Sequence, residues 1–202
     1  MTYMDFLGVI ASEAWQSHSY FNPCFLFDSR VFYYLLTPMR VLGIDPGLHI
    51  SGYGILEEDS GEVKVIEAGI LKTNDKLSME KRLAELGREL GSVIGQFHPD
   101  VMAIEELYSH YDHPKTAIIM GHARGVIISK ASEAGIEVVS YASTRIKKAL
   151  TGNGRASKEQ MQRAVQIQMT LKALPEPPDV ADALAVAYCH IHAVSRSEVV
   201  TA

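Results

Sequence analysis

Two acidic residues stand directly after short apolar runs, at positions where they could do chemistry. Asp45 follows the run Val41–Ile44, and Glu105 follows the run Val101–Ile104. If both runs are neighbouring parallel strands, their carboxyl ends meet at the functional edge of the sheet. We therefore expect Asp45 and Glu105 to share one site.

A second acidic pair lies near the end of the chain. Asp179 and Asp182 are three residues apart at the start of an expected helix, so both side chains project from one helix face. Hard cations such as Mg²⁺ and Mn²⁺ prefer carboxylate and water ligands, whereas softer metals favour the Cys and His that this set lacks. Two such ions on a phosphodiester lower the pKa of an attacking water and stabilise the leaving oxygen. The four acids together predict metal-dependent phosphoryl transfer.

Each acid also has an ordinary structural interpretation. Asp45 fits a turn in Asp-Pro-Gly, Glu105 fits a solvated strand end, and Asp179 after two prolines fits a helix N-cap. Asp182 is harder to explain in this way, because its neighbours are apolar and burial of an unpaired carboxylate is costly. The combination of the four residues carries the prediction.

The elements that must position these acids follow from the hydrophobic periodicity. Strands are expected at 41–44, 52–56, 63–71, 101–104 and 136–140, and helices at 79–97, 115–134, 144–150, 158–171 and 179–194. The first three strands form an antiparallel meander. Helix 79–97, with Ser78 as its N-cap and Pro99 after its end, is the crossover that makes strands 41–44 and 101–104 parallel. The sequence therefore predicts an α/β fold with a mixed five-stranded sheet flanked by helices.

Composition indicates one globular domain with an unusual leader. The chain has 202 residues, 47% of them hydrophobic, and a net charge of −5. Its two cysteines form neither a disulfide framework nor a CxxC zinc site, which is typical of the reducing cytoplasm. Residues 1–38 hold ten of the sixteen aromatic residues but only four charged ones. Proline and charged residues interrupt the apolar stretch of this leader, which makes it neither a signal peptide nor a membrane span.

The domain boundary is expected at Met39. We interpret residues 1–38 as an aromatic-rich N-terminal extension from an over-extended reading frame, and residues 39–202 as the functional domain. The alternative is a genuine apolar extension that packs on the domain or on a partner.

A basic stretch stands out against the acidic total. Its cationic residues are Arg145, Lys147, Lys148, Arg155, Lys158 and Arg163. With Glu159 as the one acid among them, the local charge is +5. The glycine-rich segment 151–154 in its middle suits contacts with DNA phosphates. The alternative is a pair of solvated helix faces. Tyr108 and Tyr111 could stack on or wedge between opened bases.

Small residues and histidines allow weaker inferences. Gly121, Ala123 and Gly125 lie among isoleucines, which favours close approach of another helix in the core or across a dimer interface. His190 and His192 face apart on a helix, which argues against a shared metal ion.

Four motifs occur in order between about Met39 and Val194. They are Gly43-Ile44-Asp45-Pro46-Gly47 with Gly52-Tyr53-Gly54, then Ala103-Ile104-Glu105, then Gly121-His122-Ala123-Arg124-Gly125, and finally Asp179-Val180-Ala181-Asp182-Ala183-Leu184-Ala185. This set closely resembles the RuvC family of Holliday-junction resolvases. The resemblance implies a ribonuclease-H-like fold, a homodimer, and two Mg²⁺ ions per active site, with Mn²⁺ as a substitute.

The resemblance also implies an activity and partners. The dimer would make paired, symmetric, metal-dependent nicks in a four-way DNA junction during recombination and repair, and would leave 5′-phosphate ends. It would work in the cytoplasm with the RuvA–RuvB branch-migration complex.

The family's functional residues carry over by position. The metal-binding catalytic carboxylates match Asp45, Glu105, Asp179 and Asp182. The DNA-contacting lysines match Lys147 and Lys158, and the aromatic residue near the junction centre matches Tyr108. Arg145, Lys148 and Arg155 are further candidate DNA contacts from the basic stretch. Glu106 and His122 depart from the family pattern.

Three alternatives remain open. The Gly-Ile-Asp-x-Gly hairpin also resembles the phosphate loop of actin-like sugar kinases and Hsp70-type ATPases, although residues 39–202 are too few for the two lobes that those enzymes need. A catalytically inactive DNA-structure-binding module is a second alternative. A related ribonuclease-H-like nuclease that acts on RNA is the third.

Overall fold

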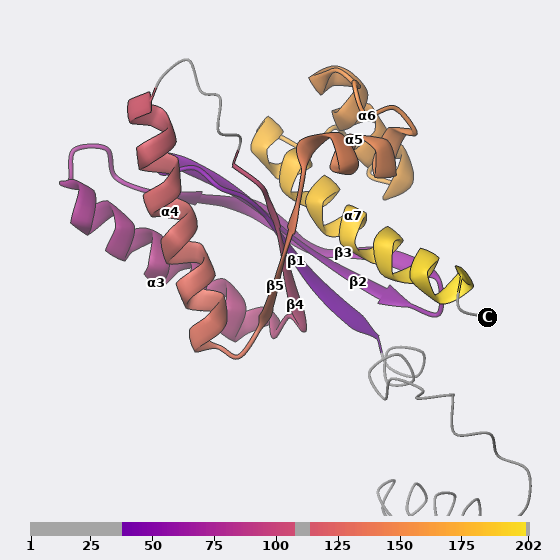
Figure 1. Ribbon diagram of the computed structural model, residues 1–202, viewed down its shortest axis with the longest axis horizontal. Helices are drawn as coiled ribbons and strands as arrows, with labels where there is room; N and C mark the ends of the chain where they lie inside the picture. The colour runs from indigo at the N-terminus through magenta and orange to yellow at the C-terminus, as the bar shows by residue number, and fades with distance from the viewer. Residues whose placement is uncertain (1–37, 108–113, 201–202) are drawn as a thin grey trace, which may run out of the picture. The chain divides into compact units, whose positions relative to one another are not determined.

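A mixed five-stranded sheet forms the centre of the domain (Figure 1). The computed structural model describes residues 38–107 and 114–200, which all belong to the unit Tyr34–Ala202. The strands are β1 (Met39–Asp45), β2 (Ile50–Asp59), β3 (Glu62–Lys72), β4 (Val101–Glu105) and β5 (Glu137–Tyr141). Their order in the sheet is β3-β2-β1-β4-β5. β1, β2 and β3 pair antiparallel, whereas β1, β4 and β5 are parallel, so the predicted meander and crossover are confirmed.

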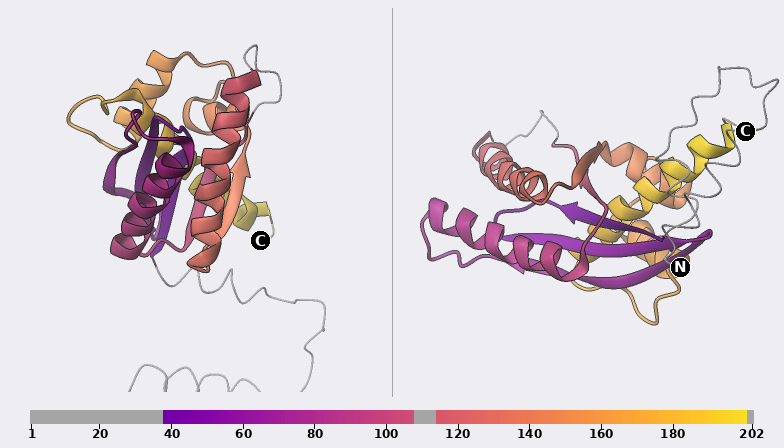
Figure 2. Two further views of the ribbon diagram at one scale, coloured as in Figure 1. Left: turned by 90° about the vertical axis from the view of Figure 1, so that its left-hand side faces the viewer. Right: turned by 90° about the horizontal axis from the view of Figure 1, so that it is seen from below.

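Helices cover both faces of the sheet (Figures 1 and 2). They are α3 (Met79–Phe97), α4 (Pro114–Glu133), α5 (Ser143–Thr151), α6 (Lys158–Gln168) and α7 (Pro178–Val200). α3 and α4 pack on one face, and α7 packs on the other with α5 and α6 beside it. In the left view of Figure 2, α3 and α4 stand in front of the sheet.

Helix ends differ from the sequence prediction at three places. α6 ends at Gln168 rather than at residue 171, because Thr170 adopts a left-handed conformation with φ of 50°. α7 continues to Val200, beyond the expected end at residue 194. Ser78 occupies the N-cap of α3, but its hydroxyl bonds the Glu80 side chain instead of a backbone N–H.

Strand alternation decides which side chains meet which helices. In β1, Leu42 and Ile44 are fully buried against α3 and α4, whereas Val41 is buried on the α7 side. Asp45 follows in the same alternation and therefore faces α7. The same rule places Glu105 on the α7 side of β4.

Two glycines let α7 lie directly on the sheet. A Cβ atom on Gly43 would stand 2.1 Å from the Ala183 carbonyl oxygen, and one on Gly52 would stand 1.9 Å from the Asp179 carbonyl oxygen. The helix backbone therefore occupies the space that any larger residue would need. This close approach brings the start of α7, with its acidic pair, to the ends of β1 and β4.

Two features of the domain bear on its chemistry and setting. Within residues 38–107 and 114–200, no helix has both the length and the apolar character needed to cross a bilayer. Cys189 is a buried free thiol, and Cys24 lies outside the described residues.

Candidate active site

A cavity of about 250 Å³ opens where the parallel strands end. Its lining residues are Asp45, Glu105, Ser143, Ile146, Lys147, Lys158, Met161, Asp182 and Ala185. They come from β1, β4, α5, α6 and α7. The structure therefore brings together three of the four predicted acids and both lysines of the resemblance.

Backbone register explains how the acids meet. Ile44 pairs with Ile104 across the parallel β1–β4 ladder, so the next residues, Asp45 and Glu105, leave the sheet side by side. Asp182 reaches the same cavity from the first turns of α7, whose backbone rests on the strand glycines. Asp179 does not line the cavity, but its charge acts on both Asp45 and Asp182.

The carboxylates of the cavity are partly buried, and their charges repel one another. Burial, and after it the charges of Asp182, Glu105 and Asp179, together raise the pKa of Asp45 to about 7, while Lys158 opposes the rise. Burial is also the main cause that raises the pKa of Asp182. The site thus concentrates negative charge more than its own lysines neutralise.

Two groups partly offset this repulsion. Burial raises the pKa of Glu105, while a hydrogen bond with the Ser143 side chain works in the opposite direction. The ammonium of Lys158 stands 3.9 Å from a carboxylate oxygen of Asp182, and its side chain is 79% exposed, which makes this ion pair weak.

Ser143 is the site residue that the sequence analysis missed. It is the first residue of α5, two positions after β5, the third parallel strand, ends at Tyr141. The end of a third parallel strand at the same sheet edge was the available signal.

The donor chemistry of the cavity suits a hard divalent cation. Its lining acids are carboxylates, without any cysteine or histidine. In the described part of the chain, no three acidic, histidine or cysteine side chains stand close enough to hold one metal ion together. The charges of these carboxylates raise one another's pKa, and a bound divalent cation would offset that repulsion.

Comparisons with known proteins identify the family. The chain matches the family model "Crossover junction endodeoxyribonuclease RuvC" over residues 41–190. It belongs to the RuvC family. The RuvC of Rhodopirellula baltica is 48% identical over 149 residues, which cover 74% of this chain and 84% of the relative. The RuvC of Caldicellulosiruptor saccharolyticus is 48% identical over 154 residues, which cover 76% of this chain and 92% of the relative.

Solved structures agree with this family and confirm the ribonuclease-H-like fold. The structure of T. thermophilus RuvC in complex with a Holliday junction substrate has a TM-score of 0.74 at 31% identity, over 79% of this chain and 96% of that one. The yeast mitochondrial Holliday junction resolvase Ydc2 has a TM-score of 0.56 at 13% identity, over 85% of this chain and 89% of that one, and supports the fold alone.

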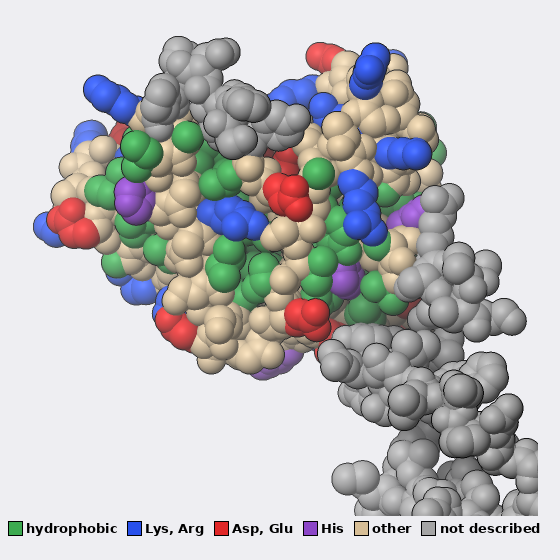
Figure 3. Space-filling model, viewed as in Figure 1, with side chains coloured by type: hydrophobic (Ala, Val, Ile, Leu, Met, Phe, Trp, Pro, Cys, Tyr) green, Lys and Arg blue, Asp and Glu red, His purple; other side chains and the backbone are tan. Residues whose placement is uncertain are grey.

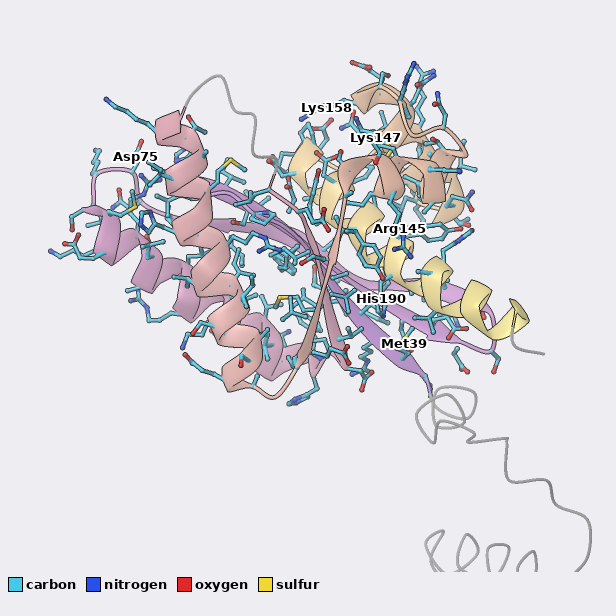
Figure 4. All side chains as sticks on the ribbon, in the orientation of Figure 1. Met39, Asp75, Arg145, Lys147, Lys158 and His190 are labelled. Carbon is cyan, nitrogen blue, oxygen red and sulfur yellow. The ribbon has the colours of Figure 1, made fainter. Side chains whose placement is uncertain are left out.

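The basic stretch of α5 and α6 divides between two cavities. Lys147 and Lys158 lie beside the N-terminal end of α7, whereas Arg145 lies farther along α7, near His190 (Figure 4). Arg145 and Lys148 line a separate cavity of about 270 Å³ with Cys189 and His192. Arg155 lines neither cavity; it is exposed, and its backbone N–H donates to Asn153.

Arg145 lines the second cavity and also contacts an aromatic pair outside its lining. The Arg145 guanidinium lies over the Tyr141 ring, 4.9 Å from its centroid, and the Tyr141 hydroxyl is 2.9 Å from His190 Nδ1. Burial lowers the pKa of His190 and raises the pKa of the Cys189 thiol to about 11. The described residues that line this cavity include no acid. Its charge is therefore positive, opposite to that of the acidic cavity.

The remaining predicted positions lie beside the acids, on α4 or outside the described residues. Glu106 is exposed and lines a second cavity of about 420 Å³ beside the acids, which it shares with Asp45, Glu105 and Ser143. His122 is exposed on α4. Tyr108 and Tyr111 lie outside the described residues.

The repulsion around Asp45 predicts a gain of stability on its removal. The folded-state pKa is about 7 against 3.8 for the unfolded chain, so the contribution of this carboxyl group to stability is greatest below about pH 4 and is lost as pH rises to 7 and beyond. In metal-free protein at pH 8, we expect Asp45→Asn to raise the free energy of unfolding by about 2 to 4 kcal/mol, or Tm by roughly 5 to 10 °C. At pH 4 the difference should vanish. Thermal scans with a chelator at both pH values measure this, and equal Tm values at pH 8 would contradict it.

Proposed function

We propose that this protein resolves four-way DNA junctions by metal-dependent hydrolysis of two symmetric phosphodiester bonds. The observation that carries this proposal is the buried acidic cavity at the ends of β1 and β4, in a chain of the RuvC family. The proposed activity is that of a crossover junction endodeoxyribonuclease, which leaves 5′-phosphate ends during recombination and repair.

Different side chains of the cavity would carry out different parts of the proposed reaction. Asp45, Glu105, Asp179 and Asp182 would hold Mg²⁺, two ions per site, with Mn²⁺ as a substitute. When bound, these ions lower the pKa of the attacking water and stabilise charge on the leaving oxygen. Ser143 orients the Glu105 carboxylate through its hydrogen bond. Lys147 and Lys158 line the same cavity, where their charges attract the scissile phosphate and stabilise its extra negative charge during cleavage.

Further basic residues would hold the junction arms. Figure 3 shows Lys and Arg side chains gathered over α5 and α6. The cavity of Arg145 and Lys148 offers a second contact for a backbone phosphate, since no described acid lines it. Arg155, exposed beside the glycine-rich turn, is a third candidate contact. Tyr108 stays a predicted contact near the junction centre.

Lys147 and Lys148 are neighbours on α5 but line different cavities. Substitution of each one tests whether the two cavities have different roles. We expect Lys147→Met to lower the cleavage rate of bound junction by about 10- to 100-fold, because it removes a charge from the catalytic cavity. Lys148→Met should leave the cleavage rate within about threefold of wild type but weaken junction binding. The slope of log K against log salt concentration should become smaller by about one unit. Single-turnover cleavage and salt-titrated binding measure the two effects. Equal effects of both substitutions on the cleavage rate would contradict the division.

A homodimer through α4 is part of the proposal. Ile118 is 61% exposed on α4, and a Cβ on Gly121 or Gly125 would meet no atom within 4 Å in the described part of the chain. An exposed apolar side chain beside small residues suits close packing of a second helix. A two-fold dimer presents two identical sites to the two equivalent phosphates of a junction. Light scattering of the free protein measures its mass, and a monomer would contradict this part.

Cleavage of a mobile four-way junction is the deciding experiment. We expect paired nicks in two strands of like polarity, only with Mg²⁺ or Mn²⁺, and none in a linear duplex. Binding without cleavage would favour an inactive junction-binding module. Preferential cleavage of structured RNA would favour an RNA nuclease, and ATP hydrolysis without DNA would favour the kinase-like alternative.

Three wider assignments complete the proposal. Residues 39–202 form the nuclease domain, which is supported by the family match over 41–190 and by the acidic cavity, whose lining residues all lie between Asp45 and Ala185. A junction substrate makes the RuvA–RuvB branch-migration complex the expected partner. A DNA substrate and a free, buried Cys189 support a cytoplasmic location.

A further inference from the structure

Arg124 connects α4 to the strand end that carries Glu105. It belongs to the Gly-His-Ala-Arg-Gly motif, for which the proposed chemistry has no role. Its Nη2 donates to the Ser140 hydroxyl at 2.7 Å, and its Nε donates to the Glu105 carbonyl oxygen at 3.4 Å. One guanidinium therefore bonds residues at the ends of both β4 and β5.

These contacts reach Glu105 at the last residue pair of the β4–β5 ladder. Glu105 is the last residue of β4 and pairs with Tyr141, the last residue of β5. The next backbone N–H, of Glu106, donates to the Tyr141 carbonyl at 2.9 Å. The β4–β5 ladder ends with this hydrogen bond, so side chains must hold the residues at the strand end in place. The planar guanidinium of an arginine can hold two partners in one geometry.

The partners of Arg124 indicate a geometric role rather than charge neutralisation. Both are neutral groups, a hydroxyl and a carbonyl. Among the described residues, Arg124 makes no ion pair within 4.0 Å. Ala123, its neighbour in the chain, is fully buried in the core, so this part of α4 is firmly seated.

We propose that Arg124 is a positioning residue that sets the direction of the Glu105 carboxylate. The side chain of Glu105 faces the catalytic cavity, while its carbonyl is held from α4. The outer face of α4 is the proposed dimer surface, so Arg124 also links subunit contact to the geometry of the cavity. This inference rests on the proposed nuclease function.

The test compares cleavage with binding in Arg124 variants. We expect Arg124→Gln to lower the single-turnover cleavage rate by about 10- to 100-fold, since a misplacement of about 1 Å costs this much, with junction Kd within about threefold. Arg124→Lys should recover part of the rate, because an ammonium can bond only one of the two partners well. Ser140→Ala should lower the rate by a smaller factor and add little in the Arg124→Gln background.

A second readout does not depend on activity. In hydrogen–deuterium exchange, the peptide spanning residues 101–107 should exchange faster in Arg124→Gln, while peptides from α3 and α7 stay unchanged. Lys130→Gln is the control on the same helix, because Lys130 pairs with Glu133 on the surface. It should alter neither exchange nor cleavage.

The outcomes separate this inference from the proposed function. If Arg124→Gln cleaves like wild type, or if its Kd, Tm and exchange across the whole domain change together, the positioning role is wrong. If wild-type protein fails to cleave junctions, the proposed function is wrong, and localised exchange at 101–107 still decides whether Arg124 holds this strand end.

Discussion

We expect Asp45→Asn to reduce junction cleavage by about a thousandfold or more, while junction affinity stays within about threefold of wild type or becomes tighter. Burial first, and then the charges of all three other acids, raise the pKa of Asp45 to about 7. An amide keeps the shape of the side chain but loses the charge that would hold a cation. Binding survives because the lysines and arginines of α5 and α6 remain.

Measurement of this effect requires two assays on one preparation. Single-turnover cleavage in Mg²⁺ gives the rate, and a gel shift in Ca²⁺ or chelator gives the affinity. Asp75→Asn is the matched control, because Asp75 is exposed and lies on the α3 and α4 side, far from Lys147 and Lys158 (Figure 4). An Asp45→Asn protein that cleaves at more than about a tenth of the wild-type rate would end the catalytic assignment of Asp45.

Gly43→Ala is expected to destabilise the protein by about 3 kcal/mol or more, because the helix backbone of α7 cannot yield to the added methyl group. The new Cβ would stand 2.1 Å from the Ala183 carbonyl oxygen and 2.7 Å from the Ala187 nitrogen. To accommodate it, α7 must move away from β1 and carry its acidic pair out of the cavity. Cleavage should therefore fall together with stability.

The same substitution in an open position gives the control. A Cβ on Gly91, within α3, meets no atom within 4 Å of the described chain. Gly91→Ala should therefore stabilise the protein by about 0.5 to 1 kcal/mol, because alanine loses less backbone entropy in a helix. Urea unfolding of both variants measures the difference. A Gly43→Ala protein as stable as wild type would show that α7 does not rest on this strand.

Stability and activity make opposite demands on the acidic cavity. The charge of Asp45 lowers the free energy of unfolding of the metal-free protein, whereas the close packing of α7 on Gly43 stabilises the fold beside it. Removal of Asp45 should thus stabilise an inactive protein, and enlargement of Gly43 should give a protein that is both unstable and inactive. The two substitutions test separate parts of one site.

Local patterns in the sequence were sufficient for the elements and for most of the acids. Hydrophobic periodicity depends on neighbours in the chain, so it predicted the five strands, the crossover helix and the parallel pairing of β1 with β4. That pairing alone was enough to place Asp45 and Glu105 together at one edge of the sheet. The i, i+3 spacing of Asp179 and Asp182 added the acidic pair of α7, and the motif resemblance singled out Lys147 and Lys158 within the basic stretch.

Other features depend on residues that are distant in the sequence, and only the tertiary structure decided them. The hydrogen bonds of Ser143 and Arg124 with Glu105 join separate elements, which no local pattern specifies. Lys147 and Lys148 are adjacent in sequence, but the turn of α5 sends them to cavities of opposite charge. The pKa of Asp45 also belongs here, because burial and the approach of three other carboxylates arise when the sheet and α7 pack together. The sequence alone determined which groups take part, and the packing of α7 on the strand glycines determined how close they come.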